Sequence, residues 1–211
     1  MTPVPFVRPY RPSDRAAVGD ICVRTAHNGG DASALHPDPE LMPTIFAYPY
    51  VDREPELARV LDDGSGRAVG YILGTADTHG FVKWFRDRWL PRVADRYPLT
   101  EYPLSDGPAR TPTEEMTGLL HDPERMVRPE LTGFPAHLHI DLLPSRQGQG
   151  QGRALMWAFL DALRAAGVPA VHLCMARANT GARAFYERVG FRELGVPDPG
   201  PVWYLGRSTT R

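Results

Sequence analysis

The 211-residue sequence has only two cysteines, Cys22 and Cys174, and both lie in apolar segments. We expect two buried, reduced thiols, so neither a disulfide framework nor a zinc site is indicated. The seven histidines include no pair at metal-ligand spacing with a suitable third ligand. The sequence therefore predicts no metal.

Long apolar runs are also absent, since no stretch approaches the roughly 18 consecutive apolar residues that cross a bilayer. The first six residues contain neither a basic leader nor a long apolar stretch. These absences predict a cytoplasmic protein without a membrane partner. Lys83 is the only lysine, and the net charge of −1 argues against a sequence-independent grip on nucleic acid.

A glycine-rich loop is the most informative segment that is present, and it reads Gln147, Gly148, Gln149, Gly150, Gln151, Gly152 and Arg153. Apolar alternation over 137–143 predicts a strand before it, and helical spacing from Leu155 to Leu163 predicts a helix after it. Glycines at such a junction let free backbone N–H groups converge on a phosphate or pyrophosphate. We expect a nucleotide-bearing ligand; the alternative is a flexible linker.

Two common phosphate motifs do not fit this loop. A dinucleotide fingerprint that starts at Gly148 needs a third glycine where Arg153 stands. A nucleotide-hydrolase loop needs Gly-Lys-Ser/Thr, which the sequence lacks.

The spacing Gln/Arg-x-x-Gly-x-Gly/Ala, at Gln147, Gly150 and Gly152, resembles the acetyl-CoA pyrophosphate loop of the GNAT superfamily of N-acetyltransferases. An apolar segment at 170–175, then Asn179 and a helix that carries Tyr186, extends the resemblance over roughly 135–191. The resemblance implies an α/β (α+β) GNAT fold with a mixed, mostly antiparallel sheet of six to seven strands flanked by helices. It also implies acetyl-CoA as the acyl donor.

The whole chain looks similar to the acetyltransferase-like domain at the C-terminus of eukaryotic O-GlcNAcases. The similar segments are 8–14, 70–77, 81–83, 89–91 and 206–208. Those domains depart from a working cofactor site at the glycine loop, which this sequence keeps. We therefore expect a free-standing, cofactor-competent relative, with one domain over 1–211 and an insertion at about 78–133.

Outside the loop, the pattern predicts a first strand near 4–10 and a helix capped by Ser13. A helix near 40–48 contains Pro43, and strands are expected at 56–61 and 67–77. The tail at 194–206 is expected to form a hairpin with a long loop, and 112–120 a short helix within the insertion.

The insertion is rich in aromatic residues, which permits two interpretations. It is either an extra packing layer or a lid that shapes an acceptor pocket. On the second interpretation, the residues expected to contact the acceptor substrate are Trp84, Trp89, Tyr102 and His139.

The resemblance implies a set of acetyl-CoA-binding residues: Ile140, Leu142, Leu143, Gln147, Gly148, Gln149, Gly150, Gln151, Gly152, Arg153, Asn179 and Tyr186. Asn179 would bond the pantetheine amides, although a plain helix N-cap is an alternative role. Tyr186, two helical turns further on, would protonate the leaving thiolate; its alternative role is core packing beside Phe185.

An amine acceptor with a pKa of about 10.4 must lose a proton, which costs about 4 to 5 kcal/mol at pH 7. Asp141 is the first candidate base because it lies on the strand before the loop, Asp77 is the second, and His139 is a third. Structural hydrogen bonds are an alternative role for each. The resemblance also implies that the strand opens near 140–143, where the freed backbone N–H groups would stabilise charge on the thioester oxygen.

The sequence thus favours an acetyl-CoA-dependent N-acetyltransferase that moves an acetyl group directly to an amine of a small molecule or protein. One alternative is a catalytically weak module that binds acetyl-CoA or a peptide. Another is an acyltransferase that uses a different acyl-CoA or an alcohol acceptor. The partners expected are acetyl-CoA or CoA and an amine whose identity the sequence leaves open, as it does the oligomeric state.

Overall fold

The computed structural model describes residues 4–99 and 110–210. Within them a seven-stranded sheet has the order β1-β2-β3-β4-β5-β7-β6. The strands are β1 (Phe6–Pro9), β2 (Arg59–Asp62), β3 (Ala68–Thr75), β4 (Ala136–Leu142), β5 (Ala170–Ala176), β6 (Arg192–Glu193) and β7 (Val202–Ser208). Every neighbouring pair is antiparallel except β4 with β5. The expected mixed, mostly antiparallel sheet is confirmed.

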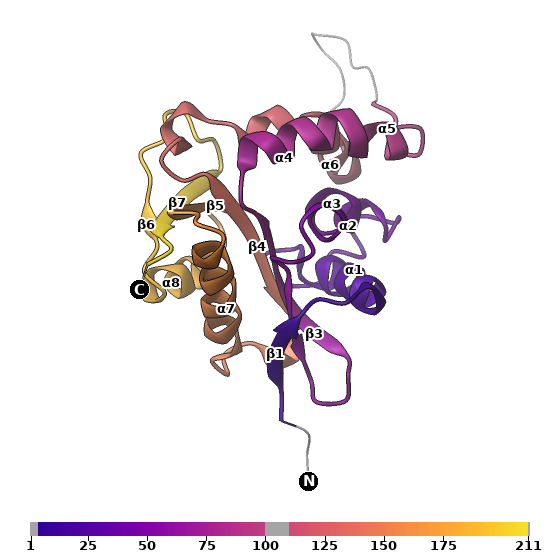
Figure 1. Ribbon diagram of the computed structural model, residues 1–211. Helices are drawn as coiled ribbons and strands as arrows, with labels where there is room; N and C mark the ends of the chain where they lie inside the picture. The colour runs from indigo at the N-terminus through magenta and orange to yellow at the C-terminus, as the bar shows by residue number, and fades with distance from the viewer. Residues whose placement is uncertain (1–3, 100–109, 211) are drawn as a thin grey trace.

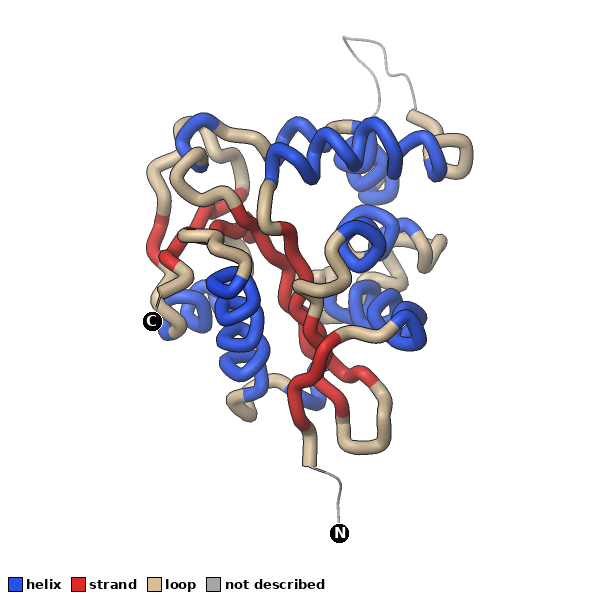
Figure 2. Tube along the Cα trace, viewed as in Figure 1, coloured by secondary structure: helices blue, strands red, loops and turns tan. Residues whose placement is uncertain are grey.

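Helices cover both faces of this sheet. They are α1 (Arg15–Thr25), α2 (Leu41–Phe46), α3 (Tyr48–Arg53), α4 (Thr78–Trp84), α5 (Leu90–Val93), α6 (Pro112–His121), α7 (Gln151–Ala165) and α8 (Thr180–Arg188). Figure 1 shows α1, α2 and α3 on one face, α7 and α8 on the other, and α4, α5 and α6 gathered at one end. The tube in Figure 2 makes the sheet between these layers easier to follow.

Shorter turns join these elements. They are η1 (Pro12–Asp14), η2 (Phe85–Trp89), η3 (Pro123–Met126), η4 (Pro129–Leu131) and η5 (Pro144–Arg146). The expected insertion is present in part as described residues, because α4, α5 and α6 with η2, η3 and η4 all lie between β3 and β4. The predicted helix at 112–120 is α6, which begins with a reciprocal cap between Thr111 and Glu114.

The core lies where α7 packs on the sheet. Leu155, Phe159, Leu160 and Leu163 are at most 1% exposed, which confirms the amphipathic face expected after the glycine loop. Gly74 on β3 allows this close approach, since a Cβ there would lie 2.5 Å from the Phe159 ring. The predicted C-terminal hairpin is also present, as β6 and β7 joined across 194–201.

Several expectations are wrong in detail. Ser13 does not cap α1 but lies inside η1. The helix expected near 40–48 is divided at Ala47 into α2 and α3, whereas Pro43 sits in the first turn of α2, where its missing N–H has no helical partner to lose. Cys22 is buried as expected, but Cys174 is exposed.

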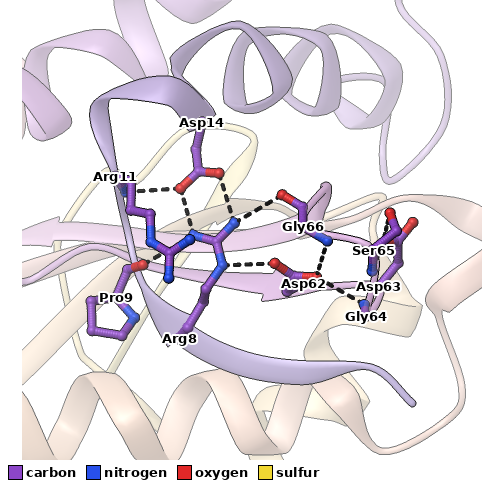
Figure 3. A network of polar contacts seen from close by, with 9 residues as sticks. All are labelled: Arg8, Pro9, Arg11, Asp14, Asp62, Asp63, Gly64, Ser65 and Gly66. Atoms are coloured by element: carbon purple, nitrogen blue, oxygen red, sulfur yellow. Dashed lines mark hydrogen bonds and ion pairs between the residues drawn. The ribbon is translucent and has the colours of Figure 1, made fainter. Parts of the chain in front are cut away.

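A buried ionic cluster joins β1, η1 and β2, as Figure 3 shows. Arg8 Nε donates to Asp62 at 2.7 Å, and its Nη atoms donate to the two oxygens of Asp14 at 2.6 and 2.8 Å. Arg8 also reaches the Gly66 carbonyl at 3.2 Å, while Asp62 accepts from the N–H groups of Gly64 and Gly66. Each charge in the cluster therefore has a partner of opposite sign.

Candidate functional site

A cavity of about 930 Å³ occupies the gap between β4 and β5. Its lining comes from the glycine loop and the start of α8, and from side chains of α1, α2 and α6. Its residues include Cys22, Thr25, Met42, Phe46, Met116, His139, Ile140, Asp141, Leu142, Arg146, Gln147, Gly148, Gly150, Gly152, Arg153, Cys174, Asn179 and Tyr186.

The gap exists because the parallel pairing is short. Only Ala136 with Val171 and His137 with His172 are in register, after which the two strands separate. Beyond β4, the Leu143 N–H donates to Val69. Since antiparallel bonding alternates, the backbone groups of Ile140 and Leu142 point away from β3 and into the gap. The strand opening expected at 140–143 is therefore present and begins earlier.

The glycines of the loop serve two purposes. Gly148 and Gly150 have φ of 71° and 81°, which side chains disfavour, and no atom lies within 4 Å of a Cβ built at either position. Gly152 instead allows close packing, since a Cβ there would lie 3.2 Å from the Phe185 ring. α7 begins directly after Gly150, so its first N–H groups lack helical partners beside this open space.

Gln147 holds the loop in place, because its Nε2 donates to the carbonyls of Leu142 at 2.9 Å and Gly29 at 3.3 Å. Gln149 also braces the loop, because its Nε2 donates to the Ser145 carbonyl at 2.9 Å. Leu143, Gln149 and Gln151, which the resemblance placed at the cofactor, do not line the cavity. Their contribution is limited to the loop's backbone and shape.

On α8, Asn179 and Tyr186 both line the cavity. The Asn179 side chain accepts from the Ala182 N–H at 3.1 Å, so it is an N-cap, and none of the described residues bonds to its amide nitrogen. Tyr186 is 8% exposed and packs on Phe185 and Phe191. Within 4–99 and 110–210, no residue hydrogen-bonds its hydroxyl, which is left for a ligand in the cavity.

Asp141 lies across the same cavity and accepts a 2.7 Å hydrogen bond from the Tyr71 hydroxyl. Burial raises the pKa of its carboxyl, and hydrogen bonds from Tyr71 and Thr25 oppose that rise. Burial also raises the pKa of Tyr186, with a further contribution from the negative charge of Asp141. The structure thus brings together the first predicted base and the predicted acid.

His139 lines the cavity and belongs to a chain of polar contacts. The Tyr50 hydroxyl lies 3.0 Å from its Nε2 and 2.8 Å from Nε2 of His137, whose Nδ1 lies 2.9 Å from the Thr78 hydroxyl. Tyr50 has one hydroxyl proton, so one imidazole accepts from it and the other donates to it. Burial, and to a smaller extent the charge of Arg125, lowers the pKa of His139 to about 4. His139 is therefore neutral at pH 7.

Other predicted site residues do not line this cavity. Asp77 is exposed at the start of α4 and faces a separate surface hollow with Trp84. Trp89 is 3% exposed, and its Nε1 donates to the Thr44 carbonyl at 2.9 Å, which is core packing. Tyr102 lies outside the described residues.

Sequence reasoning missed Met42, Phe46 and Met116, which form the apolar wall of the cavity. Met116, on α6 of the insertion, lines the cavity and so supports the interpretation of the insertion as a lid. The buried Trp89 supports its interpretation as an extra packing layer. Between residues 4 and 210, leaving out 100–109, no group of three metal-ligating side chains occurs. In the same residues no helix has the length and apolarity to span a bilayer. A cytoplasmic location stays a prediction.

Comparison with known proteins agrees with this geometry. The model of the acetyltransferase (GNAT) family matches residues 117–191. Protein O-GlcNAcase of Rattus norvegicus is 27% identical over 208 residues, which is 96% of this chain and 22% of that protein. Mycothiol acetyltransferase of Beutenbergia cavernae is 49% identical over 53 residues, 25% of this chain and 18% of that protein. The chain thus spans only about a fifth of these curated relatives.

Among solved structures, that of SsHAT is 61% identical and covers 99% of this chain and 100% of its own, with a TM-score of 0.93. The ribosomal-protein-S18-alanine N-acetyltransferase of Escherichia coli shares the fold at 16% identity, covering 99% of this chain and 96% of its own with a TM-score of 0.52. These matches agree with the fold described above, and the chain belongs to the acetyltransferase (GNAT) family of acyltransferases.

Proposed function

We propose that this chain is an acetyl-CoA-dependent N-acetyltransferase that transfers the acetyl group directly to an amine. The observation that carries the proposal is the single cavity between β4 and β5. It joins an open anion cradle at Gly148 and Gly150 to an acid–base pair, Tyr186 and Asp141. One continuous cavity suits direct transfer, because donor and acceptor must meet within it.

The residues present fit the donor. The positive-φ glycines and the free N–H groups at the start of α7 suit the pyrophosphate, with Arg146 and Arg153 on the cavity wall beside them. The unpaired backbone of Ile140 and Leu142 and the amide nitrogen of Asn179 suit the pantetheine amides. When bound, acetyl-CoA supplies the activated acetyl group.

Once the ammonium has released one proton to solvent, the reaction forms one N–C bond, breaks one C–S bond and moves one proton from the amine nitrogen to the thiolate sulfur. Asp141 is the proposed base, because its raised pKa brings it closer to that of an amine while it remains hydrogen-bonded and oriented by Tyr71. His139, neutral and held by Tyr50, is proposed to orient the acceptor.

Tyr186 is the proposed acid. Its raised pKa keeps the hydroxyl protonated at neutral pH, and part of that rise comes from the charge on Asp141. When Asp141 takes the amine proton, that charge disappears and Tyr186 becomes the stronger acid. The two proton transfers would therefore be coupled within a turnover.

Calorimetric titration with acetyl-CoA tests the donor site. The unmodified chain is expected to bind with a Kd of about 1–100 μM, in the range of ordinary KM values. Gly150→Glu, which adds bulk and negative charge to the cradle, is expected to abolish binding. Gly167→Glu is the matched control: Gly167 also has positive φ and open space around its Cβ, but it lies at the far end of α7.

Equal losses in the two variants would show that backbone strain, not the cradle, is responsible. No binding by the unmodified chain would contradict the proposal outright. Tight binding without turnover of any amine would favour the alternative of a non-catalytic acetyl-CoA-binding module.

A further inference from the structure

A row of hydrogen-bonded side chains runs from the cavity to the start of α4, and we call it the histidine chain. Its members in order are His139, Tyr50, His137 and Thr78, and the three contacts that join them measure 3.0, 2.8 and 2.9 Å. The histidine chain ends on a backbone carbonyl, because the Thr78 hydroxyl lies 2.8 Å from the Pro135 oxygen. Tyr50, His137 and Thr78 are buried, and the proton transfers proposed above use none of them.

The carbonyl end fixes the direction of the bonds on either side of His137. A carbonyl oxygen can only accept, and two oxygens 2.8 Å apart repel each other without a proton between them. The Thr78 hydroxyl therefore donates its one proton to Pro135. Thr78 Oγ1 must then accept from His137, which places the His137 ring proton on Nδ1 and leaves Nε2 bare.

The same direction continues through Tyr50 to His139. The bare Nε2 of His137 accepts from the Tyr50 hydroxyl, whose oxygen in turn accepts from Nε2–H of His139. Burial lowers the pKa of His137 well below its usual value and that of His139 to about 4, so each ring carries a single proton at pH 7. The two imidazoles thus carry that proton on opposite nitrogens, Nδ1 in His137 and Nε2 in His139.

This direction leaves the other ring nitrogen of His139, Nδ1, without a proton. His139 lines the cavity, and no bond joins its Nδ1 to any residue of 4–99 or 110–210. Nδ1 is also absent from the described side-chain atoms that are both buried and unpaired, so it is accessible from the cavity. A bare imidazole nitrogen there is a hydrogen-bond acceptor that holds no partner within the described part of the protein.

His139 and the proposed base share one face of β4. They are two residues apart on the strand, so their Cα atoms lie about 6.6 Å apart and both side chains face the same way. Asp141 also lines the cavity. An amine beside Asp141 is therefore within reach of His139.

We propose that the histidine chain fixes the tautomer of His139, and that the bare Nδ1 accepts a hydrogen bond from the N–H of the acceptor amine. The second part rests on the proposed acetyltransferase function. Thr78, His137 and Tyr50 are then positioning residues. An amine that donates one N–H to His139 and another to Asp141 keeps its lone pair free to attack the thioester. Because the histidine chain ends on a carbonyl, which takes up no proton, it orients His139 and does not conduct protons.

The tautomers can be measured without any acetyl transfer. In the full-length protein with ¹⁵N-labelled histidine, proton-bearing and bare ring nitrogens give well-separated signals in long-range ¹H–¹⁵N spectra at pH 7. His137 is expected to carry its proton on Nδ1 and His139 on Nε2. The loss of one ring's signals in His137→Asn and in His139→Asn assigns the two residues.

Thr78→Val tests the direction from the far end of the histidine chain. Valine has nearly the same shape but no hydroxyl, so the His137 Nδ1–H loses its acceptor and the proton is expected on Nε2. Tyr50 then donates to His139, whose proton is expected on Nδ1. Thr78→Ser keeps the hydroxyl and should keep the original tautomers. Tyr50→Phe retains the ring that stacks on Phe81 but interrupts the histidine chain, so adding Thr78→Val to it should no longer change His139.

Thr209→Val is the matched control. Thr209 is also buried, and its hydroxyl donates to the Val168 carbonyl at 2.7 Å, so this variant loses a similar bond elsewhere and should leave both tautomers unchanged. Protons on the same ring nitrogen of His137 and His139 in the unmodified protein would overturn the proposal. So would a His139 tautomer that Thr78→Val does not change. If Thr78→Val fails to fold, the tautomers of the unmodified protein decide.

The hydrogen bond to the amine is measured by thiol release from acetyl-CoA, with alkylamines and amino acid amides as acceptors. Thr78→Val turns His139 Nδ1 from an acceptor into a donor, so kcat/KM for the amine should fall roughly tenfold. The KM for acetyl-CoA should stay within about twofold, and Thr78→Ser should retain the activity of the unmodified protein. An unchanged kcat/KM in Thr78→Val, with the tautomer reversed, would overturn the bond to the amine.

The two proposals fail in different ways. If no amine is acetylated while the tautomers are as expected, the acetyltransferase proposal fails and the positioning of His139 stands. If amines are acetylated but the tautomers differ from those expected, the histidine chain fails and the acetyltransferase proposal stands.

Discussion

Arginines that are buried or partly buried occur in two regions of this molecule, in opposite electrostatic settings. Arg8 lies between two carboxylates and a backbone carbonyl, in a cluster whose donors and acceptors are matched. Arg125 donates to two backbone carbonyls and the Nε of Arg128 has no hydrogen-bond partner, and neither guanidinium forms an ion pair with a carboxylate of the described residues. Hydrogen bonding to Asp14 raises the pKa of Arg8, whereas burial lowers that of Arg125.

The comparison separates a charge that the fold neutralises from charges that the fold leaves without a carboxylate. The matched cluster contributes to stability and responds to the protonation of its own carboxylates, whereas removing an unmatched charge should cost little stability. The two regions should therefore differ in how a substitution changes the free energy of unfolding.

The largest expected effect is that of Arg8→Met. This change leaves Asp14 and Asp62, which are 4% and 2% exposed, buried without their counter-charge. Removing one member of such a pair costs about 3–5 kcal/mol. Urea unfolding at pH 7 measures the loss, and calorimetry under native conditions should show acetyl-CoA affinity within about twofold of the unmodified chain. Unchanged stability would mean that the contacts drawn in Figure 3 do not stabilise the joining of β1, η1 and β2.

The second largest effect is expected from acid, which should lower the stability that the Arg8 cluster contributes. Burial alone would raise the pKa values of Asp14 and Asp62, but hydrogen bonds from Arg8 and from backbone N–H groups outweigh burial and lower both. The folded state then binds fewer protons than the unfolded one, so this stability is present above about pH 4 and is lost as the pH falls below it. Unfolding measured at pH 7, 5 and 3 checks the trend. Arg8→Met should flatten it, and an equally steep loss in that variant would assign the effect elsewhere.

The smallest expected effect is the change in stability of Arg125→Met. The variant loses two bonds to carbonyls at the end of α6 but also removes an uncompensated buried charge. These contributions oppose each other, so the free energy of unfolding should change by no more than about 1 kcal/mol. A loss comparable to that of Arg8→Met would show that Arg125 is structural.

Much of the donor half of the site could be predicted from the sequence. The glycine loop, the flanking strand and helix, Asn179 and Tyr186 lie close together along the chain, and each has a local pattern that the structure places on one cavity. Asp141 also lies close to the glycine loop in sequence, on the strand that precedes it. Whether these residues act as proposed is for the experiments above to decide.

The apolar wall of the cavity could not be predicted in the same way. Met42, Phe46 and Met116 come from α2 and α6, far from the loop in sequence, and no motif distinguishes them from core residues. Aromatic enrichment suggested Trp89, but its indole N–H satisfies a carbonyl of α2. A buried and an exposed aromatic look alike in one sequence. The contrast between Arg8 and Arg125 is also invisible there, because it depends on which carboxylates the fold brings near.

The early separation of β4 and β5 has a consequence for solubility. Unpaired strand edges attract other chains and promote aggregation. Here the outer edges are short, with four residues in β1, which ends at Pro9, and two in β6. The edges of β4 and β5 that separate beyond His137 and His172 face each other across the cavity, inside the sheet rather than at its margin. Neither is therefore an outermost edge, onto which a neighbouring molecule most readily adds a strand.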